Sequence, residues 1–339
     1  MKAVEVARPG VLTIAERPMP PDPGSDEVLI KVRAVGICGS DMHVYRGRSA
    51  FATYPRVIGH EISGEVASVG RGVLGLSAGD KVVVDPVISC GSCYACRLGR
   101  PNVCRDVKCL GVHVDGGAQE YIVAKRDKVY KVSQSLSFEA ASTVEPYSIA
   151  AQALSRGRAV GDDMALVCGA GPIGLVILQG LKAIGAKVAI TDMVGSRLER
   201  AISCGADATV NSATQNLEGF AMDFTGGEGF PLIFEATGNI QVLELVVSRL
   251  VSQAGRVVVL GYPPEKAQIS PLDIMRRELD ILGSRLNNNQ FPTAIKWVER
   301  GDVDPSKIIS HTFPFQDAQK AISFIEENPH EVCKAILKF

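Results

Sequence analysis

The chain has 339 residues, of which 46% are apolar, and its 36 basic and 37 acidic side chains give a formal net charge of −1. This length and composition are typical of a folded globular protein with room for two domains. The balanced charge argues against nucleic acid or an anionic membrane as a partner and favours a small molecule. We expect a cytoplasmic protein, because no apolar run approaches the roughly 20 residues that span a bilayer and the first residues contain no apolar signal core.

Short strands and glycine-rich turns are predicted for the first part of the chain, up to about residue 148. Apolar and charged residues alternate from Val28 to Ala34, which is typical of a strand with one buried face. Further short strands are predicted at 66–69 and 81–84, with several glycines in the turns between them. This part is therefore predicted to be an irregular, β-rich domain that can hold a site on its loops.

Two segments of this domain combine residue types that bind metal, namely Cys38-Gly-Ser-Asp-Met-His43 and Gly59-His60-Glu61. A thiolate, an imidazole and a carboxylate on glycine-rich segments suit an open, reactive zinc site better than a closed structural one. Glu145, just before Pro146 at the predicted domain crossing, is a further candidate ligand. An ordinary hydrogen-bonded loop around the His-Glu pair remains an alternative at this point.

Four of the nine cysteines are bunched within fifteen residues, at Cys90, Cys93, Cys96 and Cys104. In a reducing compartment such crowding favours metal over disulfides, and four thiolates close a tetrahedron around a structural zinc ion. The alternatives are an iron–sulfur cluster, whose common spacings this pattern does not resemble, and a nucleic-acid-binding zinc finger, which the neutral chain disfavours.

Alternating βα units are predicted from about residue 160. The predicted strands cover 164–168, 187–191, 208–211, 232–236, 257–261 and 279–284, and the predicted helices cover 172–184, 196–204 and about 241–253. Six strands with helical crossovers indicate an α/β fold with a doubly wound, largely parallel sheet. Two amphipathic helices, around 291–300 and 316–327, and a last strand at 332–337 are predicted to follow.

A glycine motif, Gly169-Ala-Gly171-Pro172-Ile173-Gly174, follows the first of these strands and opens the next helix. Gly169 allows a tight turn, Gly171 lets the backbone approach a pyrophosphate, and Gly174 lets the helix pack on the strand. Asp192 ends the second strand, where it can accept hydrogen bonds from a ribose and repel a 2′-phosphate. These features favour NAD over NADP, although Arg197 could serve either coenzyme.

In this order, the motifs resemble those of the zinc-dependent medium-chain dehydrogenases, in particular the polyol and threonine dehydrogenase branch. Segments 54–61, 110–113 and 284–287 further resemble a bacterial subgroup labelled starvation-sensing protein, whose relatives include dehydrogenases of sugar acids. The resemblance implies a GroES-like catalytic domain formed by residues 1–148 and 287–339, with a structural zinc lobe at about 88–106. A Rossmann domain over 149–286 is inserted between its two parts.

The resemblance also implies two zinc ions per chain. It makes Cys38 and His60 ligands of a catalytic zinc, with Glu61 and Glu145 competing for the remaining positions and Glu145 favoured. Alcohol dehydrogenases have a second cysteine in this shell, and a carboxylate in its place leaves zinc a harder Lewis acid. As a hypothesis, Ser40 takes the proton of the substrate hydroxyl and passes it through the coenzyme ribose to His43, unless His43 has only a structural role.

We therefore predict NAD-dependent oxidation of a secondary hydroxyl of a sugar acid, such as L-gulonate or L-galactonate, to a ketone. A neutral polyol substrate, a non-catalytic nucleotide sensor of the same fold and a zinc-free quinone or enone reductase are the alternatives. A homodimer or homotetramer is expected, since the strand at 279–284 could pair with its copy at a sheet edge. Side chains that could bind the substrate's hydroxyls or carboxylate are Tyr45, Arg46, His113, Arg285 and Asn287.

Overall fold

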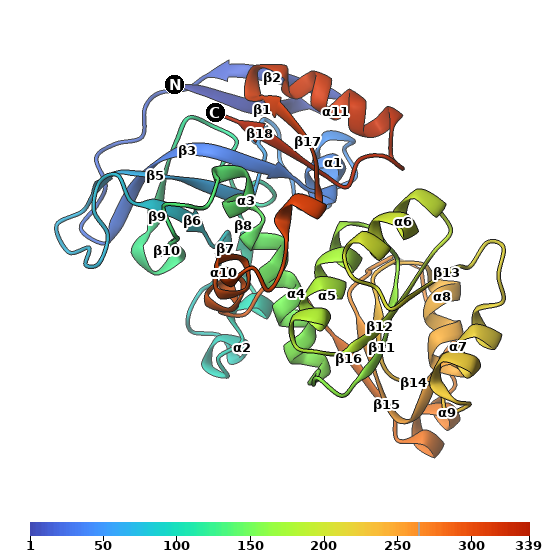
Figure 1. The fold of residues 1–339 in the computed structure, drawn as a ribbon. Coiled ribbons are helices and arrows are strands. Elements are labelled where there is room, and N and C mark those ends of the chain that lie inside the picture. The colour runs from blue at the N-terminus through green and yellow to red at the C-terminus, as the bar shows by residue number, and fades with distance from the viewer. Residues whose placement is uncertain (264) are drawn as a thin grey trace. The chain divides into compact units, whose positions relative to one another are not determined.

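A computed structural model describes residues 1–263 and 265–339 of the chain (Figure 1). The chain divides into two compact units. The first unit comprises Met1–Glu145, Asn287–Arg300 and Ile309–Phe339, and the second comprises Pro146–Leu286 and Gly301–Ile308. The segment 301–308, which the sequence assigned to the catalytic domain, thus belongs to the second unit, where the Asp304 backbone N–H donates to Gln179 Oε1 at 2.6 Å.

A seven-stranded sheet forms the centre of the first unit, with the order β10-β6-β5-β3-β18-β17 and β9 also paired to β3. Its strands are β3 (Glu27–Ile37), β5 (Glu61–Val69), β6 (Lys81–Val84), β9 (Tyr121–Lys125), β10 (Val129–Lys131), β17 (Ile309–Pro314) and β18 (Lys334–Lys338). The last strand of the chain, β18, pairs antiparallel with β3 near the start of the chain, as Figure 1 shows in red and blue. Both ends of the sequence therefore build the same sheet.

Two smaller sheets complete the strands of this unit. One has the order β2-β1-β4, made of β1 (Lys2–Arg8), β2 (Val11–Glu16) and β4 (Arg56–Val57), and the other pairs β7 (Val87–Ile88) with β8 (Lys108–Cys109). Val28, Ile30 and Val32 of β3 are buried in the main core of this unit, and they alternate with the more exposed Leu29 and Lys31.

Helices of the first unit are short, and several begin at loops that carry functional residues. They are α1 (Gly39–Tyr45), α2 (Tyr94–Arg97), α3 (Phe138–Ser142), α10 (Phe291–Arg300) and α11 (Ala318–Glu327). The two amphipathic helices predicted near the carboxyl terminus are confirmed as α10 and α11. In α11, Ala318, Ala321 and Ile322 form the buried stripe that helical spacing predicts.

The second unit is built on a six-stranded parallel sheet with the order β13-β12-β11-β14-β15-β16. Its strands are β11 (Met164–Cys168), β12 (Lys187–Asp192), β13 (Ala208–Asn211), β14 (Phe230–Glu235), β15 (Val251–Val259) and β16 (Asp280–Gly283). Helices are α5 (Pro172–Ala183), α6 (Gly195–Ser203), α7 (Leu217–Thr225), α8 (Ile240–Leu245) and α9 (Pro271–Arg277), and α4 (Val144–Gly157) enters from the first unit. The predicted doubly wound parallel sheet is confirmed.

One predicted helix, at about 241–253, is too long. Helix α8 ends at Leu245, a π-helical turn covers Val246–Leu250, and strand β15 already begins at Val251. Val251 pairs with Phe230 of β14, so the tertiary sheet takes residues that the apolar pattern alone assigned to a helix. No helix among the described residues is long and apolar enough to cross a membrane.

Candidate functional site

Three residues of the first unit form a candidate metal-binding site. One ligand atom each from Cys38, His60 and Glu61 lies within 4.8 Å of the others. Cys38 follows β3 and is the N-cap residue of α1, while Glu61 opens β5, which pairs antiparallel with β3. Gly36 lies opposite Glu61, and a β-carbon there would come within 1.8 Å of Glu61 Oε2. Glycine at this position therefore makes room for the carboxylate.

Asp41, a residue that the sequence interpretation missed, connects the two arms of the site. It is fully buried, and its carboxylate accepts hydrogen bonds from the backbone N–H groups of Cys38 at 2.8 Å and Gly59 at 2.9 Å. Its Oδ1 also lies 3.7 Å from His60 Nδ1. Metal-ligating histidines commonly have a carboxylate on their second nitrogen, and the Asp inside Cys-Gly-Ser-Asp was the signal for it.

Lys334 was also missed. Its ammonium group donates to Glu61 Oε1, and the two side chains are only 3% and 1% exposed. The nearby charge of Glu61 outweighs burial and raises the pKa of Lys334 above its usual range. A lysine inside an apolar terminal strand is the feature of the sequence that could have pointed to this buried pair, although nothing in the sequence indicated its partner.

The sequence favoured Glu145 over Glu61 as the metal-binding carboxylate, but the close group of the structure contains Glu61 and not Glu145. Glu145 is buried and interacts electrostatically with His60, Glu61 and Cys38. Burial raises its pKa to about 8, aided by the charges of Glu61 and Cys38 and opposed by His60. Burial also raises the pKa of the Cys109 thiol to about 12, and Cys109 is not among the three residues whose ligand atoms lie close together.

The residues present fit a zinc ion. Glu61 Oε2 is buried and has no hydrogen-bond partner, and a buried polar atom without a partner is costly. Because Asp41 lies on the Nδ1 side of His60, Nε2 is the nitrogen left for a metal ion. Burial would raise the pKa of the Cys38 thiol, but the neighbouring His60 outweighs it and the pKa is lowered, which favours thiolate. The group offers a sulfur, a nitrogen and an oxygen donor, with further carboxylates nearby. Zinc is intermediate between hard and soft metal ions and binds all three donor types.

Ser40 and His43 lie on α1, beside this group. Ser40 Oγ is 3.5 Å from His60 Nε2, so the hydroxyl faces the ligand atoms. His43, three residues further along the same helix, is exposed to solvent. These two positions are compatible with the expected proton relay, in which the serine lies inside the site and the histidine meets water.

The four cysteines of the lobe form the second candidate zinc site, in the first unit. The Sγ–Sγ distances are 3.4 Å for Cys90–Cys104, 3.8 Å for Cys93–Cys104, 3.5 Å for Cys93–Cys96 and 4.0 Å for Cys90–Cys96. A tetrahedral site with Zn–S bonds of about 2.3 Å requires about 3.8 Å between sulfurs. Backbone N–H groups point at the sulfurs, and those of Ser92 and Cys93 help to lower the pKa of Cys90 to about 6. Burial, by contrast, raises the pKa of Cys96 to about 11, so the distances between the four sulfurs are what indicate a site for one metal ion.

The glycine motif of the second unit has the geometry that its pattern predicts. Gly169 has a φ of +99°, which favours glycine. A β-carbon at Gly174 would come within 1.8 Å of Gly169 O, so the helix approaches the turn closely, whereas at Gly171 it would meet nothing within 4 Å. Pro172 and Ile173 open α5, whose N-terminal N–H groups are suited to an anion.

Asp192 ends β12 beside this turn and fixes it. Its carboxylate accepts hydrogen bonds from Ala170 N–H at 2.8 Å and from Val194 N–H at 3.0 Å, and lies 3.8 Å from the Arg197 guanidinium. Each carboxylate oxygen accepts more than one hydrogen bond, so capacity for a ribose hydroxyl remains. The arrangement is that of a dinucleotide-binding turn.

Comparison with known proteins decides the family. Residues 24–134 match the family model described as alcohol dehydrogenase GroES-like domain, and residues 172–300 match the one described as zinc-binding dehydrogenase. The chain belongs to the zinc-binding alcohol dehydrogenases. It is thus an enzyme with two zinc sites, a structural one of four cysteines and a catalytic one of cysteine, histidine and glutamate.

Relatives of this dehydrogenase include several named proteins. It is 41% identical to the starvation-sensing protein RspB of Escherichia coli K12, over 100% of this chain and 99% of RspB. It is 34% identical to a Bacillus subtilis sorbitol dehydrogenase (99% and 97% covered) and 31% to an E. coli L-galactonate-5-dehydrogenase (94% of both). A crystal structure of RspB from E. coli CFT073 complexed with NADH has a TM-score of 0.94 to this chain at 41% identity, covering 100% of it and 99% of RspB.

Of the residues expected to bind substrate, two of the first unit have other partners. Arg46 forms an ion pair with Glu326 of α11 at 2.8 Å. Asn287 is 3% exposed and donates to Asp85 at 3.1 Å. Both side chains thus have partners within the fold, and a role for either in substrate binding stays a prediction.

The other three candidates differ in their surroundings. Tyr45 is 9% exposed and packs in the core, with its hydroxyl 3.4 Å from Gln319. Arg285 is exposed. His113 accepts a hydrogen bond from Cys109 N–H at 3.1 Å and stacks on Phe51 at 4.9 Å between ring centroids. A role in substrate binding stays a prediction for all three residues.

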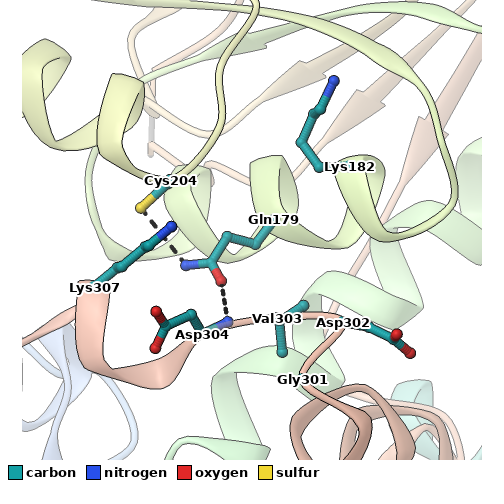
Figure 2. A pocket seen from close by; sticks show the side chains of 8 residues that line it. All are labelled: Gln179, Lys182, Cys204, Gly301, Asp302, Val303, Asp304 and Lys307. Atoms are coloured by element: carbon teal, nitrogen blue, oxygen red, sulfur yellow. Dashed lines mark hydrogen bonds between the residues drawn. The ribbon is translucent and has the colours of Figure 1, made fainter.

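A pocket of about 130 Å³ occurs elsewhere in the second unit, between α5, the end of α6 and the segment 301–308. Figure 2 shows Gln179 reaching from α5 toward Cys204 and the backbone of Asp304, with Lys307 beside them. Lys182 of this pocket lies eight residues along α5 from Gly174, which is about 12 Å at 1.5 Å per residue. The pocket is therefore separate from the dinucleotide turn.

Proposed function

We propose that this dehydrogenase oxidises a secondary hydroxyl of a sugar acid, such as L-gulonate or L-galactonate, to a ketone, with NAD as hydride acceptor. The observation that carries the proposal is the close group of Cys38, His60 and Glu61, with the Ser40 hydroxyl beside it. Similarity to RspB and to the L-galactonate-5-dehydrogenase supports a sugar acid, since the latter acts on one by name.

In this proposal each residue has a defined task. Cys38, His60 and Glu61 hold zinc, and Glu145 is the alternative carboxylate ligand. Zinc, when bound, supplies a Lewis acid that lowers the pKa of the substrate hydroxyl. Ser40 receives the hydroxyl proton as it passes its own proton on, and His43, which is exposed, exchanges a proton with solvent. Asp41 and Lys334 hold His60 and Glu61 in place.

NAD is the proposed coenzyme, with NADP less favoured. Gly169, Gly171, Pro172, Ile173 and Gly174 are proposed to approach the pyrophosphate, and Asp192 to bind the adenosine ribose while Arg197 lies beside it. The Asp192 carboxylate would repel a 2′-phosphate. The NADH complex of RspB supports this coenzyme, because RspB aligns with the whole of the present chain.

We further propose a GroES-like catalytic domain with an inserted Rossmann domain, in a cytosolic homodimer or homotetramer. None of the nine cysteines forms a disulfide, which agrees with a reducing compartment. Strand β16 ends the order of the six-stranded sheet. An open edge of this kind can pair with its copy about a two-fold axis, and a solution mass measured by light scattering tests the assembly.

A neutral polyol is the second candidate substrate, and a specific observation favours it. Acidic side chains, Asp41, Glu61 and Glu145, surround the metal group, with Lys334 already paired to one of them. A carboxylate substrate would add negative charge there, whereas a polyol would not. Similarity to the sorbitol dehydrogenase supports this alternative.

Initial rates with NAD and NADP over a panel of hexonates and polyols test the proposal. The panel includes L-gulonate, L-galactonate, sorbitol and galactitol at equal concentration with zinc-replete enzyme. We expect the highest kcat/KM for a hexonate with NAD. Activity on sorbitol without activity on any hexonate would establish the polyol alternative, and no turnover on the whole panel despite two bound zinc ions would favour a nucleotide-sensing regulator.

A further inference from the structure

Glu235 is a buried carboxylate that the proposed reaction does not use. It is 1% exposed and ends β14, next to β11 in the middle of the parallel sheet. In register it lies level with Cys168, the residue before the glycine turn, and with Val259 at the end of β15. The strand order reverses between β11 and β14, and dinucleotides bind at such switch points.

Hydrogen bonds to Glu235 come from the two loops that follow β14 and β15. Its Oε1 accepts from the Thr237 N–H at 2.7 Å, from the Gly238 N–H at 3.1 Å and from the Thr237 hydroxyl. Its backbone carbonyl accepts from Leu260 N–H at 2.9 Å and Gly261 N–H at 3.3 Å. One residue thus fixes both loops at the carboxyl edge of the sheet.

These loops touch each other and the glycine turn without spare room. A β-carbon on Gly261 would lie 2.3 Å from Gly238 Cα and 2.9 Å from Glu235 Oε2. A β-carbon on Gly169 would lie 3.2 Å from Thr237 Cγ2. Because packed groups transmit displacement, a movement of the loop 236–239 would also displace the glycine turn.

We infer that Glu235 is a positioning residue for the dinucleotide, which holds the loops 236–239 and 260–261 against the glycine turn in their binding conformation. This inference rests on the proposed use of NAD. The carboxylate is suited to the task because a charged acceptor gathers three donors at one oxygen more strongly than a neutral one. Its contribution is preorganisation, so its removal weakens coenzyme binding without touching the zinc sites.

The test is a fluorescence titration of NADH with full-length wild-type and E235Q enzyme, at a temperature where both are folded. Glutamine keeps one carbonyl oxygen and the shape but loses the charge. We expect the Kd for NADH to rise about tenfold, which corresponds to about 1.4 kcal/mol. Zinc content stays at two per chain, and KM for NAD rises while KM for the hydroxyl substrate changes little.

The control is D163N. Asp163 is also a buried carboxylate of the second unit, but it precedes β11 at the opposite edge of the sheet, where it pairs with Arg256. D163N is expected to lower the melting temperature and to leave the Kd for NADH within about twofold. A wild-type Kd in E235Q, or an equal loss of affinity in D163N, would overturn the inference.

A milder variant keeps the test decisive if E235Q does not fold. T237V removes only the hydroxyl that donates to Glu235, and we expect it to raise the Kd for NADH two- to fivefold. An unchanged Kd in T237V overturns the inference in that case. Absence of NADH binding by the wild-type enzyme would instead overturn the proposed coenzyme.

Discussion

Lys334 Nζ donates to Glu61 Oε1 in the interior of the first unit, where both side chains are almost fully buried. The pair joins the last strand of the chain to the residue that follows the zinc-binding histidine. Lys334 also lies 3.4 Å from the carbonyl oxygen of Ile37, next to Cys38. A single ammonium group thereby holds both arms of the candidate catalytic site, and its loss leaves the buried Glu61 carboxylate without its ion-pair partner.

Replacement of Lys334 by methionine is expected to destabilise the protein by about 3–5 kcal/mol, the usual cost of removing one partner of a buried ion pair. Urea unfolding followed by circular dichroism measures this change. The double variant K334M/E61Q removes both charges, and we expect it to recover most of the lost stability.

The control for this change is K338M, because Lys338 lies on the same strand with a 55% exposed side chain. An exposed ion pair contributes at most about 1 kcal/mol. Equal unfolding free energies for K334M and K338M would show that the buried pair has no special role.

Asp41→Asn is expected to lower the affinity for the catalytic zinc by about 10- to 100-fold, the usual effect of a lost supporting carboxylate. Both oxygens of Asp41 accept backbone N–H groups, whereas asparagine has only one acceptor and would present its NH₂ to a donor. Competition with a chromogenic chelator measures the affinity. D80N in the same unit is the control, and D41N enzyme that retains zinc as well as D80N would contradict this role.

Cys93→Ser is expected to lower the zinc content from two ions per chain to about one, as measured by plasma mass spectrometry. Little regular structure stabilises the lobe, since α2 has only four residues, so metal loss should unfold it locally. Trypsin should then cut at the exposed Arg97 or Arg105. C204S changes a thiol outside both sites, and the same zinc loss in that variant would argue against a specific lobe site.

The parts of the molecule that could be predicted from sequence are those whose residues are close along the chain. Four cysteines within fifteen residues and a glycine turn within six residues carry their geometry in their spacing. The parallel sheet followed in the same way from alternating βα segments. Helix α8 was predicted too long because an apolar run fits a helix or a buried strand equally well, and pairing of Val251 with Phe230 decided it.

Contacts between distant segments could not be predicted in this way. Lys334 and Glu61 are separated by 273 residues, and Arg46 and Glu326 by 280. The burial of Lys334 and the ion pair of Arg46 with Glu326 on α11 could therefore be recognised only in the folded structure. Glu61 rather than Glu145 joins Cys38 and His60 in the close group. This too depends on contacts between distant segments, because β5 carries Glu61 and pairs with β3.

Ser40→Ala is expected to lower kcat by at least about 100-fold with the best substrate, as loss of a proton acceptor in the transition state commonly does. Zinc content should not change, because Ser40 Oγ is 3.5 Å from His60 Nε2 and is not itself in the ligand group. S40T retains a hydroxyl and should recover activity. Near-normal turnover by S40A would exclude the proposed relay.

Asp192→Asn is expected to reduce the preference for NAD over NADP, measured as the ratio of the two kcat/KM values, by about tenfold or more. The change removes the negative charge that would repel a 2′-phosphate, and it leaves Arg197 without its carboxylate neighbour, so the guanidinium becomes available to that phosphate. Asparagine keeps one oxygen for Ala170 N–H, which limits disturbance of the turn.

The control is D207N, in the same unit, where Asp207 pairs with Lys182 at 2.7 Å far along α5. An unchanged coenzyme ratio in D192N would show that Asp192 supports the glycine turn without selecting the coenzyme, whereas a similar fall in both variants would indicate a general loosening of the unit.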